Sequence, residues 1–186
     1  MKRGEKNRAA LVAAAARLFW QQGYAATSLA DIARAADVPL GNIYYYFRSK
    51  AGFAMAVADV FVDETGAMLS EIEHEHDRPR ERLALLVTRL ARSLKSRVAH
   101  GCPIAFAVRD FSIAAPDASK RAGESFELLT GFIARELGRT GVRPSLALAT
   151  ARSAVAEWQG GMMLAFALKD AAVLSESFRR MDQMLG

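Results

Sequence analysis

Apolar residues recur every three or four positions along almost the whole chain, a spacing typical of amphipathic helices. Near the start, Leu11, Ala15, Leu18 and Phe19 fall at i, i+4, i+7 and i+8, which places them on one face of a helix over about residues 6–22. Strand signals are missing, because the sequence has no sustained alternation of apolar and polar residues and no Asn-Gly turn. The pattern therefore predicts an all-α fold.

Three helices are predicted within the first 50 residues. Gly23 ends the first helix, Ser28 begins the capping-box pattern of the second, and Pro39 stands at the first position of the third. Ile43 and Phe47, four residues apart, mark the inward face of the third helix. Two helices joined by a short break, with another helix before them, are typical of the helix-turn-helix arrangement, whose last helix enters the major groove of DNA.

The rest of the chain predicts a larger helical bundle. A long fourth helix is expected at about 50–75, and it joins the two parts directly because the sequence has no flexible linker. Later helices are expected at about 83–94, 103–116, 117–139, 144–169 and 171–184. We therefore expect an N-terminal helix-turn-helix head over residues 1–50 and a helical bundle over residues 51–186.

The net charge of +5 lies wholly within the first 50 residues. That segment has three acidic residues, whereas the remainder has 17 residues of each sign. Its eight basic residues are Lys2, Arg3, Lys6, Arg8, Arg17, Arg34, Arg48 and Lys50. Phosphates attract Lys and Arg whatever the base sequence, so a nucleic acid would meet this end first. Charge alone leaves a solvated basic face as the alternative.

The third helix carries polar, small and aromatic residues outside its inward stripe. These residues are Leu40, Gly41, Asn42, Tyr44, Tyr45 and Tyr46. Tyrosine hydroxyls and backbone N–H groups commonly bind phosphates, and Lys50 adds a charge beside a helix N-terminus. Three consecutive tyrosines cannot all point to one side of a helix, so packing remains open for at least one of them.

The segment Gly23–Lys50 reads GYAATSLADIARAADVPLGNIYYYFRSK. It resembles the DNA-binding head of the TetR family of bacterial transcriptional regulators, from its Gly-aromatic pair to its closing Ser-Lys. The resemblance implies that Thr27, Tyr44, Tyr45 and Lys50 contact phosphates, while the start of the third helix contacts bases. The full set expected at DNA is Thr27, Ser28, Leu40, Gly41, Asn42, Tyr44, Tyr45, Tyr46 and Lys50.

Two positions depart from the family pattern. Pro39 replaces the usual Ser or Thr cap, and Leu40 stands where a polar or basic residue is frequent. Because Leu40 cannot donate to guanine, we expect it to touch a thymine methyl group or nothing. Gly101–Ile104 and Gln159–Gly161 are similar to a subgroup of the family related to multidrug-resistance repressors.

The resemblance also implies that the bundle binds an effector and forms a homodimer. The last two predicted helices carry more apolar residues than one side of a small bundle needs, and a two-fold dimer would bury the excess. The residues expected at that interface are Val155, Gly160, Gly161, Phe166, Val173, Leu174, Phe178 and Met181. Burial within a single chain is the alternative.

An effector pocket is expected between helices of the bundle. Its candidate wall residues are Phe61, Phe106, Phe111, Phe126, Trp158 and Met162, each of which is also a candidate for plain core packing. No set of polar residues converges there in the sequence, which favours an apolar or aromatic effector.

Other chemistry has little support. The single Cys102 excludes an intramolecular disulfide, and neither His74–Asp77 nor His100 with Cys102 has the spacing of a metal site, so we expect no metal and no cofactor. No catalytic motif of the common hydrolase, phosphate-loop or zinc-protease kinds is present.

The longest apolar runs, residues 9–16 and 160–168, are too short to span a bilayer. The basic start imitates a secretory signal, but Glu5, Asn7 and Arg17 weaken that pattern, so we expect a cytoplasmic protein that contacts no membrane.

Together these features predict a sequence-specific DNA-binding regulator and not an enzyme. We expect a repressor that a small molecule releases from a palindromic operator. The alternative is a helical protein that binds or metabolises a small molecule and whose basic head is only a solvated surface.

Overall fold

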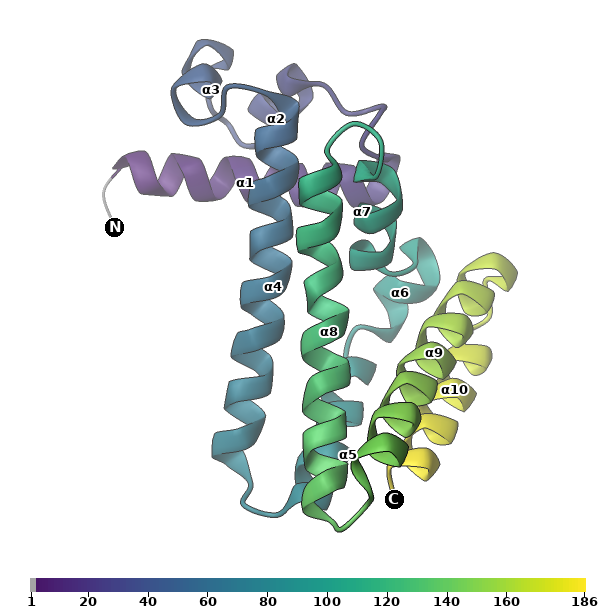
Figure 1. The fold of residues 1–186 in the computed structure, drawn as a ribbon. Coiled ribbons are helices and arrows are strands. Elements are labelled where there is room, and N and C mark those ends of the chain that lie inside the picture. Colours follow the sequence, from purple (N-terminus) through teal and green to yellow (C-terminus); the bar gives the residue numbers. More distant parts are fainter. Residues whose placement is uncertain (1–2) are drawn as a thin grey trace. The chain divides into compact units, whose positions relative to one another are not determined.

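The computed structural model describes residues 3–186, without the side chain of Arg3, and that range contains ten helices and no strand (Figure 1). The helices are α1 (Arg3–Gln22), α2 (Leu29–Ala35), α3 (Leu40–Tyr46), α4 (Lys50–Glu75), α5 (Pro79–Ala91), α6 (Leu94–His100), α7 (Pro103–Phe111), α8 (Pro116–Arg139), α9 (Pro144–Leu168) and α10 (Ala171–Leu185). The all-α prediction is confirmed. Lys2 and the side chain of Arg3, both counted in the basic charge, lie outside the described residues.

The helix predicted over 83–94 corresponds to α5, which begins at Pro79 and ends at Ala91, and a separate helix that was not predicted, α6, follows over Leu94–His100. They separate at Ser93, whose hydroxyl donates to the carbonyl of Leu90 at 3.4 Å and accepts from Nε of Arg97 at 3.1 Å. A serine that bonds to nearby groups competes with the helical hydrogen-bond pattern. The spacing of apolar residues does not reveal such a break.

The chain folds into two compact units. The first comprises the chain up to Val62 together with Pro103–Glu124, and it contains α1, α2, α3, α7 and the first parts of α4 and α8. Its fully buried large side chains come from five helices and are Leu11, Ile32, Ile43, Phe53 and Phe111. Within it, the rings of Phe19, Tyr24 and Phe111 meet edge to face with centroids 5.1–5.7 Å apart. This aromatic cluster joins the end of α1 to α7.

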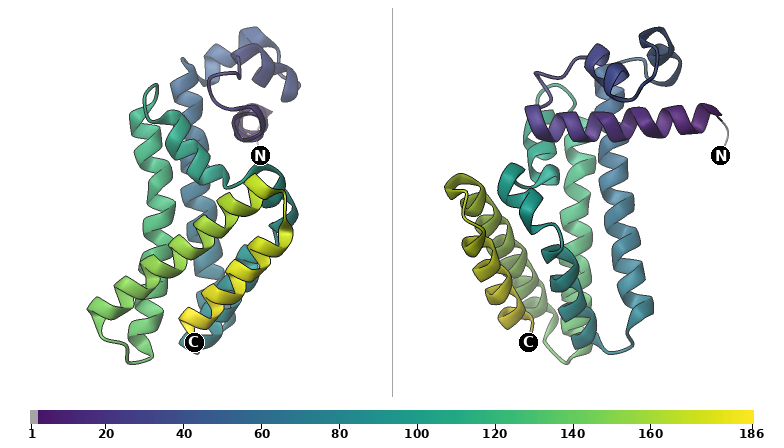
Figure 2. Two further views of the ribbon diagram at one scale, coloured as in Figure 1. Left: turned by 90° about the vertical axis from the view of Figure 1, so that its right-hand side faces the viewer. Right: turned by 180° about the vertical axis from the view of Figure 1, so that it is seen from behind.

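The second unit comprises Asp63–Cys102 and Ser125–Gly186. In it α9 and α10 pack side by side (Figures 1 and 2). Its interior includes Leu83, Leu86, Ile133, Met162 and Leu174. The fully buried carboxylate of Glu136 forms ion pairs with Arg82 at 3.4 Å and with Arg139 at 2.5 Å, so its charge is compensated.

Two adjacent glycines of α9 have opposite surroundings, which gives a prediction for stability. A Cβ on Gly161 would overlap the side chain of Ser177 on α10, whereas a Cβ on Gly160 would meet no atom within 4 Å. We expect Gly161→Ala to lower the free energy of unfolding by about 1–3 kcal/mol through overpacking. In the isolated subunit, where no atom lies within 4 Å of that Cβ, Gly160→Ala should raise it by up to about 1 kcal/mol, since alanine favours helix. Urea unfolding of the two variants checks this, and equal effects would contradict the packing described.

Two other features bear on function. No helix within residues 3–186 is long and apolar enough to cross a membrane. The same residues contain no group of three or more His, Cys, Asp or Glu side chains arranged to hold a metal ion.

Candidate nucleic-acid interface

The start of α2 is fixed by a reciprocal capping box. Ser28 Oγ accepts a hydrogen bond from the backbone N–H of Asp31 at 3.1 Å, and the Asp31 carboxylate accepts from the N–H of Ser28 at 3.0 Å. Hydrogen bonds from the Ser28 side chain and backbone hold the pKa of Asp31 below its usual value. The exposed hydroxyl of Ser28 therefore stabilises the helix start.

A sharp turn connects α2 to α3. Asp37 adopts a left-handed conformation with φ of 53°, and the next residue, Val38, is buried. Pro39 is the N-cap of α3 and makes no side-chain capping bond, so the helix starts one residue later than predicted, at Leu40. The turn sets the direction in which α3 follows α2.

Helix α3 buries one side and exposes the other. Ile43 is fully buried and Phe47, which directly follows the helix, is 6% exposed. On the other side, Leu40 is 47%, Tyr44 61% and Tyr45 84% exposed. Gly41 and Asn42 are exposed as well. Five of the residues predicted at DNA thus share one accessible surface.

Tyr46 is half-buried and extends that surface toward α1. Its ring meets the ring of Tyr45 edge to face, with centroids 5.0 Å apart. Its hydroxyl lies 3.8 Å from the place where a side chain on Gly4 would begin. This tyrosine therefore partly packs against the start of α1, as the limit on three consecutive tyrosines requires.

The side chains of Thr27 and Lys50 form hydrogen bonds within the chain. The buried hydroxyl of Thr27 donates to the carbonyl of Gly23 at 2.9 Å and accepts from the side-chain amide of Gln22 at 3.2 Å. Lys50 Nζ donates to the carbonyl of Ala25 at 3.1 Å and lies 4.4 Å from the ring centroid of Tyr24. Both side chains hold the turn before α2, and their contact with phosphate stays a prediction.

Burial affects the ionisation of Lys50 and of the tyrosine beside it. Partial burial lowers the pKa of Lys50 and raises the pKa of Tyr24. An ammonium group has three donors, so Lys50 keeps capacity for a phosphate while it holds the carbonyl of Ala25.

Sequence reasoning did not single out Arg8 and Arg48 as DNA contacts. The guanidinium of Arg8 lies 5.2 Å from the ring centroid of Phe47, at the end of α3, and Arg48 is exposed directly after that residue. The charge of both was visible in the sequence, and Arg48 directly follows Phe47, but the position of Arg8 beside α3 depends on how α1 packs.

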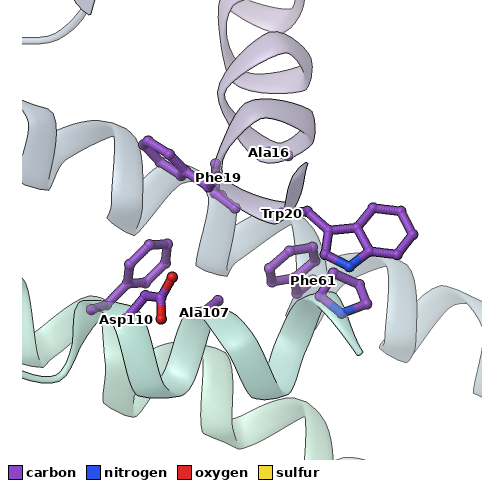
Figure 3. Close-up of a pocket in the computed structure, with 9 residues that line it drawn as sticks. Ala16, Phe19, Trp20, Phe61, Ala107 and Asp110 are labelled. Carbon is purple, nitrogen blue, oxygen red and sulfur yellow. The ribbon is translucent and has the colours of Figure 1, made fainter. Parts of the chain in front are cut away.

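The predicted effector residues are divided between the two units. Phe61 and Phe111 line a cavity of about 10 Å³ in the first unit, with room for about one water molecule (Figure 3). The other residues that line it are Ala16, Phe19, Trp20, Val57, Pro103, Ala107 and Asp110. Figure 3 shows Ala16 and Ala107 on opposite walls of this cavity, with Trp20 beside Phe61. Phe106 is absent from the lining, and its ring stacks with the guanidinium of Arg109 at 4.8 Å.

The other three candidates belong to the second unit. Trp158 and Met162 are buried there, while Phe126 lines a groove of about 380 Å³ between α8 and α9. Neither the cavity of the first unit nor this groove of the second includes all six residues, so the effector site stays a prediction.

Most of the residues predicted at the dimer interface are buried within the single chain. Val155, Gly161, Leu174, Phe178 and Met181 are buried. Gly160 is exposed, and Phe166 and Val173 are half-buried. The interface stays a prediction, and the exposed side of α9 is where apolar surface is available.

Two family models match the chain. Residues 11–57 match the model of bacterial regulatory proteins of the tetR family. Residues 79–179, more than half of the chain, match the C-terminal domain of LmrA/YxaF-like transcriptional regulators.

Individual proteins show the same likeness. An uncharacterized HTH-type transcriptional regulator in the lacX 3' region of Lactococcus lactis subsp. lactis is 28% identical over 174 residues, which cover 90% of this chain and 87% of the relative. The HTH-type transcriptional regulator TtgR of Pseudomonas putida is 40% identical over 75 residues, which cover 39% of this chain and 36% of that protein. A TetR transcriptional regulator from Chloroflexus aurantiacus has a solved structure with a TM-score of 0.80 at 26% identity, covering 98% of this chain and 96% of that one.

Proposed function

Because the chain belongs to the TetR family of bacterial transcriptional regulators, with an LmrA/YxaF-like C-terminal domain, we propose that it is a homodimeric repressor that binds a palindromic operator and leaves it when a small molecule binds. We further propose that residues 1–50 form the DNA-binding domain, that residues 51–186 bind the effector and the second subunit, and that the protein acts in the cytoplasm without catalysing a reaction.

The exposed surface of α3 is the observation that carries this proposal. A short helix held from behind by Ile43 and Phe47 presents Leu40, Tyr44 and Tyr45 outward. Such a helix fits the major groove, where side chains meet base edges and tyrosine hydroxyls meet phosphates. Leu40, at the start of α3, suits contact with a thymine methyl group.

The exposed side of α9 suits a second copy of the chain. Between residues 145 and 168 the exposed residues include one charged side chain, Arg152. Ala149, Ser153, Ala156, Gly160 and Met163 follow one another at helical spacing on that side, with small residues in the middle. Small residues allow close approach of two helices, and exposed Leu146 and Leu164 flank them.

This side of α9 is also self-complementary. Ala149 and Met163 each lie seven residues from Ala156. If two antiparallel α9 helices cross at Ala156, Ala149 of each chain faces Met163 of the other, as two-fold symmetry requires. We therefore propose Ala156 as the centre of the dimer interface.

Regulation would follow from linkage between the two ligands. The dimer has one state whose α3 helices match the spacing of the operator half-sites and another whose α3 helices do not. An effector that binds the second state more tightly lowers the DNA affinity, and the loss in binding free energy equals the effector's preference for that state. The candidate effector residues are aromatic and apolar, which favours an apolar or aromatic molecule.

Selection of bound duplexes from a random DNA pool tests the proposal. We expect enrichment of a palindrome with half-site centres about 34–36 Å apart, one turn of DNA. Failure to enrich any sequence would favour the alternative, a helical small-molecule-binding protein without a DNA target.

A further inference from the structure

The first two turns of α1 lie beside the end of α3, and we propose that their basic side chains, with Arg48, form a second DNA-contacting element. This element would bind backbone phosphates next to the bases that α3 contacts. The inference rests on the DNA-binding function proposed above and adds Lys6, Arg8 and Arg48 to it.

Two contacts join the end of α3 to the start of α1, and a third links neighbouring tyrosines of α3. The ring of Tyr45 meets that of Tyr46, the hydroxyl of Tyr46 lies next to Gly4, and the guanidinium of Arg8 covers the ring of Phe47. Figure 1 and the right-hand view of Figure 2 show α3 beside the N-terminal half of α1. A duplex seated against Tyr44 and Tyr45 therefore passes close to Arg8.

Charge on this edge is positive and exposed. Lys6, Arg8 and Arg48 are exposed, and within the described residues none of them forms an ion pair. Glu5 is the acidic residue of the same turns, so cations outnumber acids there. In the second unit, by contrast, Arg82, Arg89 and Arg180 pair with carboxylates. Cations that have no paired carboxylate and lie beside a DNA-binding helix are suited to bind backbone phosphates.

The contact with the Phe47 ring also restrains the side chain of Arg8. A planar guanidinium stacked on an aromatic ring keeps its N–H edge available for hydrogen bonds, and less conformational entropy is lost when it binds a phosphate. Phosphate contacts carry no base preference, so this element would raise affinity for all sequences equally.

The salt dependence of DNA binding tests this inference. For the full-length protein, the affinity for a selected operator and for an unrelated duplex is measured by fluorescence anisotropy at several salt concentrations. With one Arg8 contact per subunit, Arg8→Gln should reduce the slope of log affinity against log salt by about 2 on both duplexes. Its affinity should fall about 10-fold on each, with the ratio between duplexes unchanged.

Matched variants separate this role from general charge and from folding. Arg17 lies nine residues along α1, half a turn away from Arg8, so Arg17→Gln should leave the slope unchanged. Arg8→Lys keeps the charge and should keep the slope. Lys6→Gln with Arg48→Gln removes two cations from each subunit without touching the Phe47 stack, and should lower the slope by about 3 to 4.

The outcomes for this element and for the operator function are distinct. The inference would be overturned if Arg8→Gln and the Lys6/Arg48 double variant had the same slope of log affinity against log salt as Arg17→Gln. If the wild-type protein binds both duplexes equally while Arg8→Gln still reduces the slope, the proposed operator function fails and this element stands.

Discussion

Ala156→Arg is expected to convert the protein into a monomer and to weaken operator binding by at least about 100-fold, because two linked heads gain that much from binding one site together. Ala156 is exposed on α9, so the new side chain meets solvent within a single chain. In the proposed dimer it would place two guanidinium groups at the centre of an apolar contact, where burial of unpaired charge is strongly unfavourable. Light scattering should report a mass of 20.2 kDa in place of twice that value.

The control for this substitution is Ala84→Arg. Ala84 is exposed on α5, in the same unit, and the same charge is added there. This variant should remain a dimer and bind the operator as the wild type does. A dimeric Ala156→Arg variant would contradict the interface proposed on α9.

Replacement of Tyr44 and Tyr45 by alanine should weaken binding to every duplex by at least about 100-fold, since two subunits together lose four phosphate contacts worth about 1 kcal/mol or more each. Because both side chains are largely exposed, the fold should be unaffected. Gel-shift titration gives the affinities, and circular dichroism checks the fold.

A similar loss of exposed apolar surface elsewhere serves as the control. Ile113 is 94% exposed in the first unit, and Ile113→Ala should leave DNA binding unchanged. Replacing both tyrosines by phenylalanine removes the hydroxyl groups alone and should produce most of the loss. Wild-type affinity in the double alanine variant would mean that α3 does not face DNA.

The sequence predicts the head of this protein well because the signals there are local. Ser28 and Asp31 form the capping box that their spacing predicts. Gly23 has a φ of 88°, as its place at the end of α1 requires. Ile43 and Phe47 are both buried, so the four-residue spacing correctly identified the inward side of α3.

Features that depend on tertiary packing could not be predicted from the sequence. Apolar periodicity placed Leu174 and Met181 at the expected dimer interface and did not reveal that both are buried within one chain, where α9 and α10 pack together. Gly160 and Gly161 look alike in sequence, yet only Gly161 packs against Ser177. The internal contact of Lys50 with Ala25, 25 residues apart, likewise follows from how the helices pack.

The ratio of affinities for a selected operator and for a scrambled duplex of equal length measures whether the exposed side of α3 distinguishes base pairs. At physiological salt we expect a preference of at least about 1,000-fold for the operator. Equal affinity for the two duplexes would contradict it.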